Sequence, residues 1–295
     1  MRVALVYNPG AGDADHSDEA LARTIESAGH TVARRSIHDS DWKRALEQPI
    51  DLVVSAGGDG TVRKVFRAVA GTDVAVTLLP LGSANNIARA LGFHGDDVSR
   101  FVRGWDRGHR RPYRLGLFSA RGSRESFVET VGGGLFAELL ARADERDEDP
   151  GGEEDVVRGL ELLRRIVTEA HALRWDIDVD GDELSRDLLA LEVMNVAETG
   201  PNVPLSPRAE PGDGHLELVL IGPEQRDEVI AYLDARLAGG DPHAPTFDLR
   251  SGRCFAVSPP AGCPLRLDDQ LVDDQVSAAT VTAGASLDVL VPALE

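Results

Sequence analysis

Short apolar runs alternate with amphipathic segments along the first third of the chain. The apolar runs predict strands at 3–7, 31–37, 52–56 and 74–79, and the amphipathic segments predict helices at 18–28, 41–48 and 62–69. In the first of these helices Leu21, Ile25 and Ala28 fall on one face, as in a helix that covers a sheet. Strands this apolar, separated by helices, predict a parallel sheet that is buried on both faces.

The pattern changes near residue 112, where strands begin to follow one another directly. The turn Asp180-Gly181-Asp182 is typical of a hairpin between two of them. Helical patterns interrupt the strands at 153–169 and 225–237. The sequence therefore predicts two domains: an α/β parallel-sheet domain over residues 1–112, then a mainly antiparallel β-sandwich over residues 113–295. The last strand is a candidate to pack back on the first domain.

The run Ala56-Gly57-Gly58-Asp59-Gly60-Thr61 lies between a predicted strand and a predicted helix. Glycines at such a turn let the backbone approach a ligand closely, and the amides of the turn and of the new helix favour an anion such as phosphate. A carboxylate beside phosphate suits a magnesium ion. The run thus predicts a nucleotide-phosphate site with Asp59 facing the metal; the alternative is a tight turn in which Asp59 or Thr61 caps the helix.

Two further turns follow strands of the same predicted sheet, one at residues 8–12 and one at residues 80–89. Ser83 and Asn85 favour helix N-caps, which accounts for part of the second turn. Carboxyl ends of parallel strands meet at one edge, where ligands of such sheets bind. The three turns together therefore predict one binding site, although none has the spacing of a Walker loop or of a dinucleotide fingerprint.

The charge of the chain excludes some classes of partner. There are 50 acidic and 31 basic residues, a net charge of −19, and a nucleic-acid partner would favour the opposite sign. Apolar runs are too short to span a bilayer and no signal-peptide pattern is present, so we expect a cytoplasmic protein. The arginine-rich segment at 103–114 is a candidate for transient membrane contact, with ordinary surface charge as the alternative. The sequence does not indicate the oligomeric state.

The motifs in this order resemble the diacylglycerol kinase catalytic-domain family, the soluble bacterial lipid kinases related to sphingosine and ceramide kinases. Asn8-Pro9 matches the opening turn of that family and residues 57–61 match its glycine signature. Residues 80–89 match its Pro-Leu-Gly-Thr helix start, with Ser83 in place of threonine. In the second half, residues 132–137 and 213–217 match two further family segments, and the resemblance covers essentially the whole chain.

The resemblance implies a transferase of phospholipid metabolism that phosphorylates a lipid hydroxyl, such as that of diacylglycerol, with ATP and Mg²⁺ bound in a cleft between the domains. It implies a metal-binding role for Asp59, Asp213 and Glu217; for Asp213, a plain Asp-Gly turn is the alternative. The nucleotide-binding residues that it implies are Asn8, Gly57, Gly58, Asp59, Gly60, Thr61, Gly82, Ser83 and Asn85.

One departure from the family concerns the catalytic base, which the family supplies from an Asp-Gly-Glu turn. The equivalent here is Asp268-Asp269-Gln270, where an amide replaces the carboxylate. An amide can orient a hydroxyl but cannot accept its proton. The catalytic residues implied are therefore Asp59, Asp268 and Gln270, and two alternatives stay open: a catalytically weak ATP-binding homologue with a regulatory role, and an NAD kinase, which shares the glycine signature. The acceptor itself is not identified by the sequence.

Overall fold

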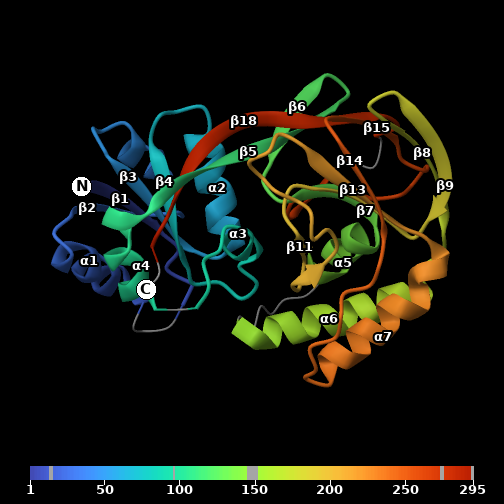
Figure 1. Ribbon diagram of the computed structural model, residues 1–295, viewed down its shortest axis with the longest axis horizontal. Coiled ribbons are helices and arrows are strands. Elements are labelled where there is room, and N and C mark those ends of the chain that lie inside the picture. The colour runs from blue at the N-terminus through green and yellow to red at the C-terminus, as the bar shows by residue number, and fades with distance from the viewer. Residues whose placement is uncertain (13–15, 96, 145–151, 273–275, 294–295) are drawn as a thin grey trace. The chain divides into compact units, whose positions relative to one another are not determined.

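A computed structural model of the chain describes residues 1–12, 16–95, 97–144, 152–272 and 276–293 (Figure 1). The chain forms two compact units. Unit 1 consists of residues 1–114 and 285–295, and unit 2 of residues 115–284.

Unit 1 is built on a parallel sheet with the strand order β2-β1-β3-β4. All three pairings within this order are parallel, and β18 (Ala279–Val291) extends the sheet by pairing in parallel with β4 through Val289 and Val76. The central strands are almost entirely buried, as their apolar sequences predict. The bounds are β1 (Arg2–Tyr7), β2 (Thr31–Ser36), β3 (Leu52–Gly57) and β4 (Ala75–Pro80).

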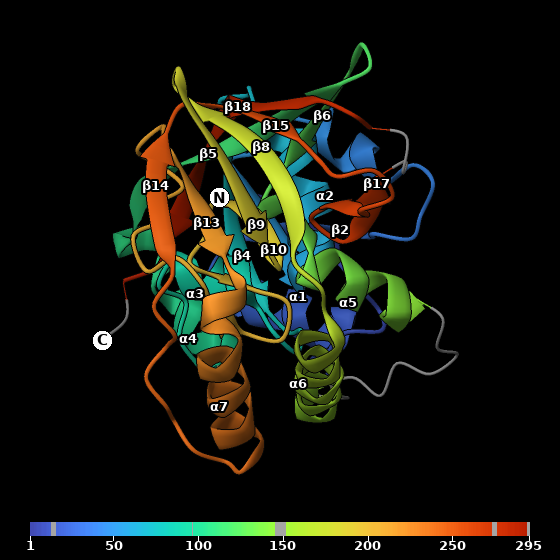
Figure 2. The same cartoon turned by 90° about the vertical axis from the view of Figure 1, so that its right-hand side faces the viewer.

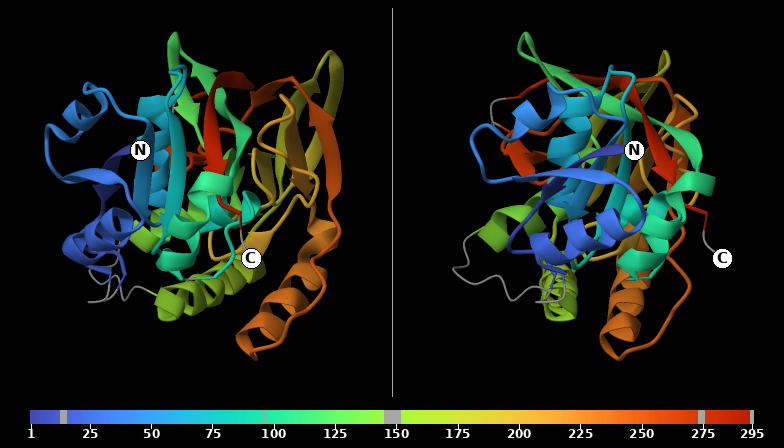
Figure 3. Two further views of the ribbon diagram at one scale, coloured as in Figure 1. Left: turned by 60° about the vertical axis from the view of Figure 1, so that its left-hand side comes forward. Right: turned by 90° about the vertical axis from the view of Figure 1, so that its left-hand side faces the viewer.

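Helices cover the two faces of this sheet. Because β2 and β4 lie on opposite sides of the β1–β3 pair, right-handed crossovers place α1 (Asp18–Ser27) and α2 (Asp59–Val69) on opposite faces. α1 packs against α4 (Val98–Arg103) and α2 against α3 (Asn86–Ala90); Figure 3 shows these helices from two further sides. The predicted helix 41–48 is instead a 3-10 helix, η2 (Trp42–Leu46), because its two buried residues are spaced by three, the period of that helix.

Unit 2 is a sandwich of two sheets. One has the order β14-β13-β10-β7-β16-β17, with every pairing antiparallel. The other contains β6, β5, β18, β15, β8 and β9, and a core that includes Phe127, Trp175 and Phe255 lies between the sheets. The strand bounds are β5 (His109–Ala120), β6 (Ser123–Phe127), β7 (Thr130–Gly134), β8 (Leu173–Val179), β9 (Asp182–Leu188), β10 (Ala190–Met194), β13 (Leu216–Ile221), β14 (Asp248–Gly252), β15 (Cys254–Ser258), β16 (Leu265–Leu267) and β17 (Gln270–Val272); a small separate pair is formed by β11 (Glu198–Thr199) and β12 (Val203–Pro204).

Three helices pack against the six-stranded sheet on the face away from the sandwich core. They are α5 (Leu135–Asp144), α6 (Gly152–Glu169) and α7 (Arg226–Leu237), and they share a second apolar core with this sheet (Figure 2). Arg226 joins α7 to α6, because its guanidinium donates to the carbonyls of Val167, Thr168 and Ala170 at the carboxyl end of α6. α6 and α7 were predicted, whereas α5 was not.

The glycine triplet 132–134 makes room for buried groups of unit 2. A side chain on Gly132 would collide with the carboxylate of Glu192, and one on Gly133 would lie 2.7 Å from the Trp175 ring. Gly134 has a φ of +86°, which turns the chain from β7 into α5. The triplet therefore has a packing role inside unit 2.

A buried ion pair lies beside Gly132. The Glu192 side chain is 0% exposed and that of Arg266 7%, and the guanidinium Nη2 lies 3.0 Å from Oε2. Thr130 Oγ1 donates to Glu192, and Arg266 donates to Thr199 Oγ1 and to the carbonyl of Asp268. Burial raises the pKa of the Glu192 carboxyl. The charge of Arg266 and the hydrogen bonds that Thr130 and Arg266 donate to the carboxylate oppose that rise.

Arg266→Met should lower the free energy of unfolding by about 3–5 kcal/mol, because it leaves a buried carboxylate without its cation. It also raises the pKa of Glu192 further. A folded-state pKa above the unfolded value of about 4.3 stabilises the fold at acidic pH, and this stabilisation is lost as the pH rises through the folded-state value. The deficit of the variant, measured by urea unfolding, should therefore be larger at pH 8 than at pH 5.

The matched control is Arg174→Met, which removes an exposed pair with Asp187 at 3.6 Å and should cost about 1 kcal/mol or less. Two results would contradict the buried Glu192–Arg266 pair: an equal loss of unfolding free energy in both variants, or a loss in Arg266→Met that does not change with pH.

Candidate functional site

Three loops of unit 1 meet at the carboxyl ends of β1, β3 and β4. The backbone amide of Asn8 donates to the carbonyl of Ala56 at 2.9 Å, and that of Leu81 to Gly57 at 3.1 Å. The chain order reverses between β1 and β3, and open α/β sheets bind their ligands at such a switch point. The structure therefore brings the loops at 8–12, 57–61 and 80–86 together at one edge of the sheet.

The backbones of Gly58 and Gly82 touch. A Cβ on Gly58 would lie 3.0 Å from Gly82 Cα, and a Cβ on Gly82 would collide with Gly58 Cα. Gly57 is confined as well, because its Cβ would lie 2.5 Å from Thr61 Oγ1. Glycine is thus required here by close approach of the two loops.

Asp59 ties these loops together. Its Oδ2 accepts the amide of Asn86 and its Oδ1 that of Ile87, each at 3.0 Å, so the carboxylate caps α3 from a different segment of the chain. Burial raises the pKa of the Asp59 carboxyl, while the Arg63 guanidinium and the backbone amides of the α3 start oppose the rise. A carboxylate offers about four lone-pair sites, so Asp59 could accept these amides and also bind a cation brought by a phosphate ligand.

The side chains of Asn8 and Asn85 shape their own loops. Asn85 has a φ of 52°, and its amide group exchanges hydrogen bonds with the Gly82 backbone at 3.1 and 2.6 Å. Asn8 Oδ1 accepts the amide of Gly10 at 3.0 Å and lies 3.1 Å from His38 Nε2. His38 was missed by the sequence analysis, although its position directly after a strand of this sheet was a usable signal. The Ser83 hydroxyl has no hydrogen bond within the described residues.

The first turn of α2 offers backbone donors. Its first intrahelical bonds are made by the amides of Thr61 and Val62 to Gly58, so the amides of Asp59 and Gly60 precede the hydrogen-bonded ladder. Donors of this kind at a helix N-terminus bind anions. The loops can therefore offer a phosphate these backbone amides and the hydroxyl of the half-buried Ser83.

Asp268 occupies a buried position in unit 2. It is 3% exposed, and its carboxylate accepts the backbone amides of Val128, Glu129 and Thr130 at 2.8–3.2 Å. Its φ of 54° belongs to the turn between β16 and β17. These contacts indicate that Asp268 holds the backbone before β7, so we assign it no proton-transfer role.

Gln270 lies instead at a surface pocket. It is exposed at the start of β17 and lines a pocket of about 500 Å³, here called the edge pocket. The lining of the edge pocket combines buried apolar residues, such as Phe118 and Leu267, with polar and charged side chains. Its lining residues are Phe118, Ala120, Arg121, Ser123, Glu125, Leu267, Gln270, Leu271, Val272 and Val276.

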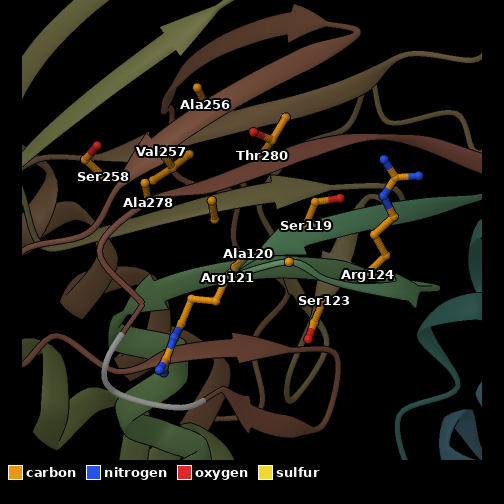
Figure 4. Close-up of a pocket in the computed structure, with 12 residues that line it drawn as sticks. Ser119, Ala120, Arg121, Ser123, Arg124, Ala256, Val257, Ser258, Ala278 and Thr280 are labelled. Carbon is orange, nitrogen blue, oxygen red and sulfur yellow. The ribbon is translucent and has the colours of Figure 1, made fainter.

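A second pocket, of about 420 Å³, lies on the outer side of the same hairpin of β5 and β6. Figure 4 shows Arg124 and Ser119 close together beside this pocket, while Arg121 points away from them. Small side chains such as Ala256 and Thr280 form the rest of its lining. The sequence did not predict either pocket.

Asp213 and Glu217 differ in their surroundings. Asp213 is exposed in the loop before β13, where its Oδ1 accepts the amide of His215 at 2.8 Å, whereas Glu217 is buried within β13. Across the part of the chain that the structure describes, no three His, Cys, Asp or Glu side chains come together as a metal cluster. The metal-binding role of Asp213 and Glu217 stays a prediction.

Comparison with known proteins agrees with these motifs. Residues 2–118 match the family model of the diacylglycerol kinase catalytic domain, and residues 157–285 match that of the YegS C-terminal NAD kinase beta sandwich-like domain. The chain is 27% identical to a diacylglycerol kinase of Bacillus subtilis, over 81% of this chain and 79% of the relative. It is 25% identical to a probable lipid kinase YegS-like of Pseudomonas aeruginosa, over 96% and 92%.

The chain joins a diacylglycerol kinase catalytic domain to a YegS C-terminal domain. The predicted resemblance is thereby confirmed.

Solved structures confirm the fold of the chain. A putative diacylglycerol kinase from Bacillus anthracis superimposes with a TM-score of 0.72 at 16% identity, covering 98% of this chain and 97% of that one. Yeast NADH kinase complexed with NADH superimposes with a TM-score of 0.53 at 11% identity, covering 99% and 84%. At these identities the likeness concerns the fold alone. The predicted α/β domain followed by an antiparallel β-sandwich is confirmed.

Among the described residues, no helix combines the length and apolarity that crossing a bilayer requires.

Gly82→Ala should destabilise unit 1, because its methyl group would collide with the Gly58 backbone. Overpacking of this kind costs about 1–3 kcal/mol, which thermal unfolding would show as a lower midpoint. Gly60→Ala adds the same methyl group to the neighbouring loop, where it meets only the end of the Arg63 side chain at 3.7 Å. The Gly60 variant should unfold close to the wild-type midpoint, and equal midpoints for both variants would contradict the close contact.

Proposed function

We propose that this protein transfers the γ-phosphoryl group of ATP to a lipid hydroxyl such as that of diacylglycerol. The observation that carries the proposal is the contact of Gly58 with Gly82 beneath the first turn of α2. This contact joins the two loops without intervening side chains. The backbone amides at the N-terminus of α2 therefore stay accessible to an anion. Similarity to lipid kinases supplies the reaction class.

In this proposal the amides of Asp59 and Gly60 and the Ser83 hydroxyl bind ATP phosphates. Phosphoryl transfer depends mainly on positioning and on neutralising negative charge. Asp59 contributes by holding the start of α3 against the loop of Gly58. The same carboxylate would bind a magnesium ion carried by ATP. Bound Mg²⁺ would offset the charge of the phosphates.

The lipid acceptor is favoured by the relatives and by unit 2. The relatives that align over most of the chain are a diacylglycerol kinase and probable lipid kinases. The edge pocket offers both apolar and polar side chains to such a ligand. Yeast NADH kinase shares the fold at 11% identity, so NAD phosphorylation is the alternative that an assay must separate.

The test incubates the protein with γ-labelled ATP and Mg²⁺, and with either diacylglycerol in mixed micelles or NAD. Label should enter the lipid. Labelling of NAD in preference to lipid would replace the proposal with the NAD kinase alternative. MgATP binding with no labelled lipid or NAD would support the weak, regulatory homologue.

Asp59→Asn should lower lipid phosphorylation by about 100-fold or more, the scale on which a single group that stabilises the transition state acts. In asparagine an NH2 group replaces one carboxylate oxygen, so one of the amides of Asn86 and Ile87 faces a donor instead of an acceptor. We therefore also expect a loss of about 1–3 kcal/mol of stability, and the rates should be compared below the unfolding transition of the variant.

The control for this prediction is Asp73→Asn, which changes an exposed carboxylate of unit 1 away from the three loops. It should keep wild-type rate and stability. If the Asp59→Asn variant is fully active, Asp59 has no role in phosphoryl transfer.

A further inference from the structure

Helix α2 is positively charged within a strongly acidic chain. It contains three basic residues, Arg63, Lys64 and Arg67, and one acidic residue, Asp59, which gives a net charge of +2, while the whole chain carries −19. The amino-terminal end of a helix is already positive because of its backbone dipoles, so a further cation near this end is unfavourable by itself. An anionic ligand at the start of α2 would offset this charge.

The side chain of Arg63 lies over the first turn of α2. A Cβ on Gly60 would lie 3.7 Å from Arg63 Nη2, so the guanidinium reaches back along the helix to the level of Gly60. Long side chains in helices commonly point toward the N-terminus in this way. Arg63 is half-buried, whereas the neighbouring Lys64 is exposed. The guanidinium therefore lies next to one of the two residues whose amides precede the hydrogen-bonded ladder of α2.

The charge of Arg63 also acts on the Asp59 carboxylate. Burial raises the pKa of this carboxyl, and the Arg63 charge is the strongest influence in the opposite direction, ahead of the amides of Ile87 and Asn86. The guanidinium thus favours the ionised form of Asp59. The two charges lie close enough to interact at the start of α2.

A phosphate bound by the amides of Asp59 and Gly60 would bring negative charge close to the Asp59 carboxylate. Like charges that lie close together repel each other, and more strongly where water is partly excluded. A magnesium ion carried by ATP is one cation that could offset this repulsion, and the guanidinium of Arg63 is another that the chain itself provides. A guanidinium presents its N–H donors in a planar fork that fits phosphate oxygens.

On the basis of the phosphate site proposed above, we propose that Arg63 binds the phosphate chain of ATP together with the amides of Asp59 and Gly60. The ligand class of this part of the site is a polyphosphate. Because the charge of Arg63 is fixed in the protein, the site accepts a polyphosphate before a metal ion is present. Without Arg63 the Asp59 carboxylate repels the phosphates, and binding then depends on Mg²⁺ to bridge the two.

The test is Arg63→Met, with the dissociation constant of ATP measured by calorimetry in Mg²⁺ and again in EDTA. A hydrogen bond to a charged group is worth about 10- to 100-fold in binding. The dissociation constant should therefore rise about 10-fold in Mg²⁺ and about 100-fold in EDTA, where nothing else offsets the Asp59 charge. A role confined to packing would raise both constants by the same factor.

The matched control is Lys64→Met, which removes the adjacent positive charge of the same helix from an exposed side chain. Both of its dissociation constants should stay within about twofold of wild type, because an exposed charge contributes little. Arg63→Lys keeps the charge and loses the planar fork, so its dissociation constant in EDTA should lie between those of wild type and Arg63→Met.

A double variant separates direct binding from an effect through Asp59. If Arg63 contacts the phosphates, adding Arg63→Met to Asp59→Asn should still weaken ATP binding in EDTA by about 10-fold or more. If Arg63 only offsets the Asp59 charge, this addition changes nothing. The proposal is overturned by that second result, by an Arg63→Met variant that behaves like Lys64→Met, or by equal losses in Mg²⁺ and in EDTA.

Sodium tripolyphosphate in EDTA tests the Arg63 site apart from the kinase function. If wild type labels no lipid but binds tripolyphosphate about 10-fold more tightly than Arg63→Met does, the kinase function fails and the role of Arg63 stands. If lipid is labelled and Arg63→Met binds ATP and tripolyphosphate as wild type does, the role of Arg63 fails and the kinase function stands. A wild-type protein that binds neither ligand overturns the role of Arg63.

Discussion

The candidate site of unit 1 depends on two peptide backbones that touch without intervening side chains. Gly58 and Gly82 belong to loops that follow adjacent strands, and any Cβ on either glycine would push the loops apart. Their contact sets the distance between the first turn of α2 and the start of α3. Asp59 then fixes the two helix starts to each other. Backbone packing thus determines where the donors of this site lie.

Carboxylates hold the backbone at several places in this protein. Asp59 binds two amides of α3, Asp268 binds three amides before β7, and Asp180 binds the amides of Arg253 and Cys254 between β14 and β15. Such a group satisfies several donors at once where no carbonyl is available. In unit 1 it also places a negative charge beside donors suited to phosphate, which explains why a cation accompanying the phosphate would be favourable there.

The sequence predicted what depends on local pattern. Buried strands such as 52–56 read as continuous apolar runs, and glycine turns directly after strands predicted the meeting of the three loops. Features that depend on residues far away in the chain were not predicted. β14 and β15 follow one another closely yet lie in different sheets, and the Asp180 carboxylate accepts the amides of residues 253 and 254 where they separate. Helix α5 follows directly on the glycine triplet and was not predicted.

The residues of unit 2 show the same limit. Asp268 and Gln270 are two positions apart in the sequence, yet one is buried under three amides and the other lines a pocket. Burial of this kind is set by residues 128–130, which lie more than 100 positions away in the sequence.

The pairing of β18 with β4 has a consequence for synthesis of the chain. Unit 1 takes its fifth strand from the carboxyl-terminal residues, with Thr77 Oγ1 donating to the carbonyl of Leu290 and Gly71 to that of Ser286. While the ribosome makes the preceding residues, β4 has no partner on this side. An apolar strand edge that stays open during translation is prone to pair with other chains. Nascent molecules that stall before residue 285 are therefore the ones we expect to aggregate or to need a chaperone.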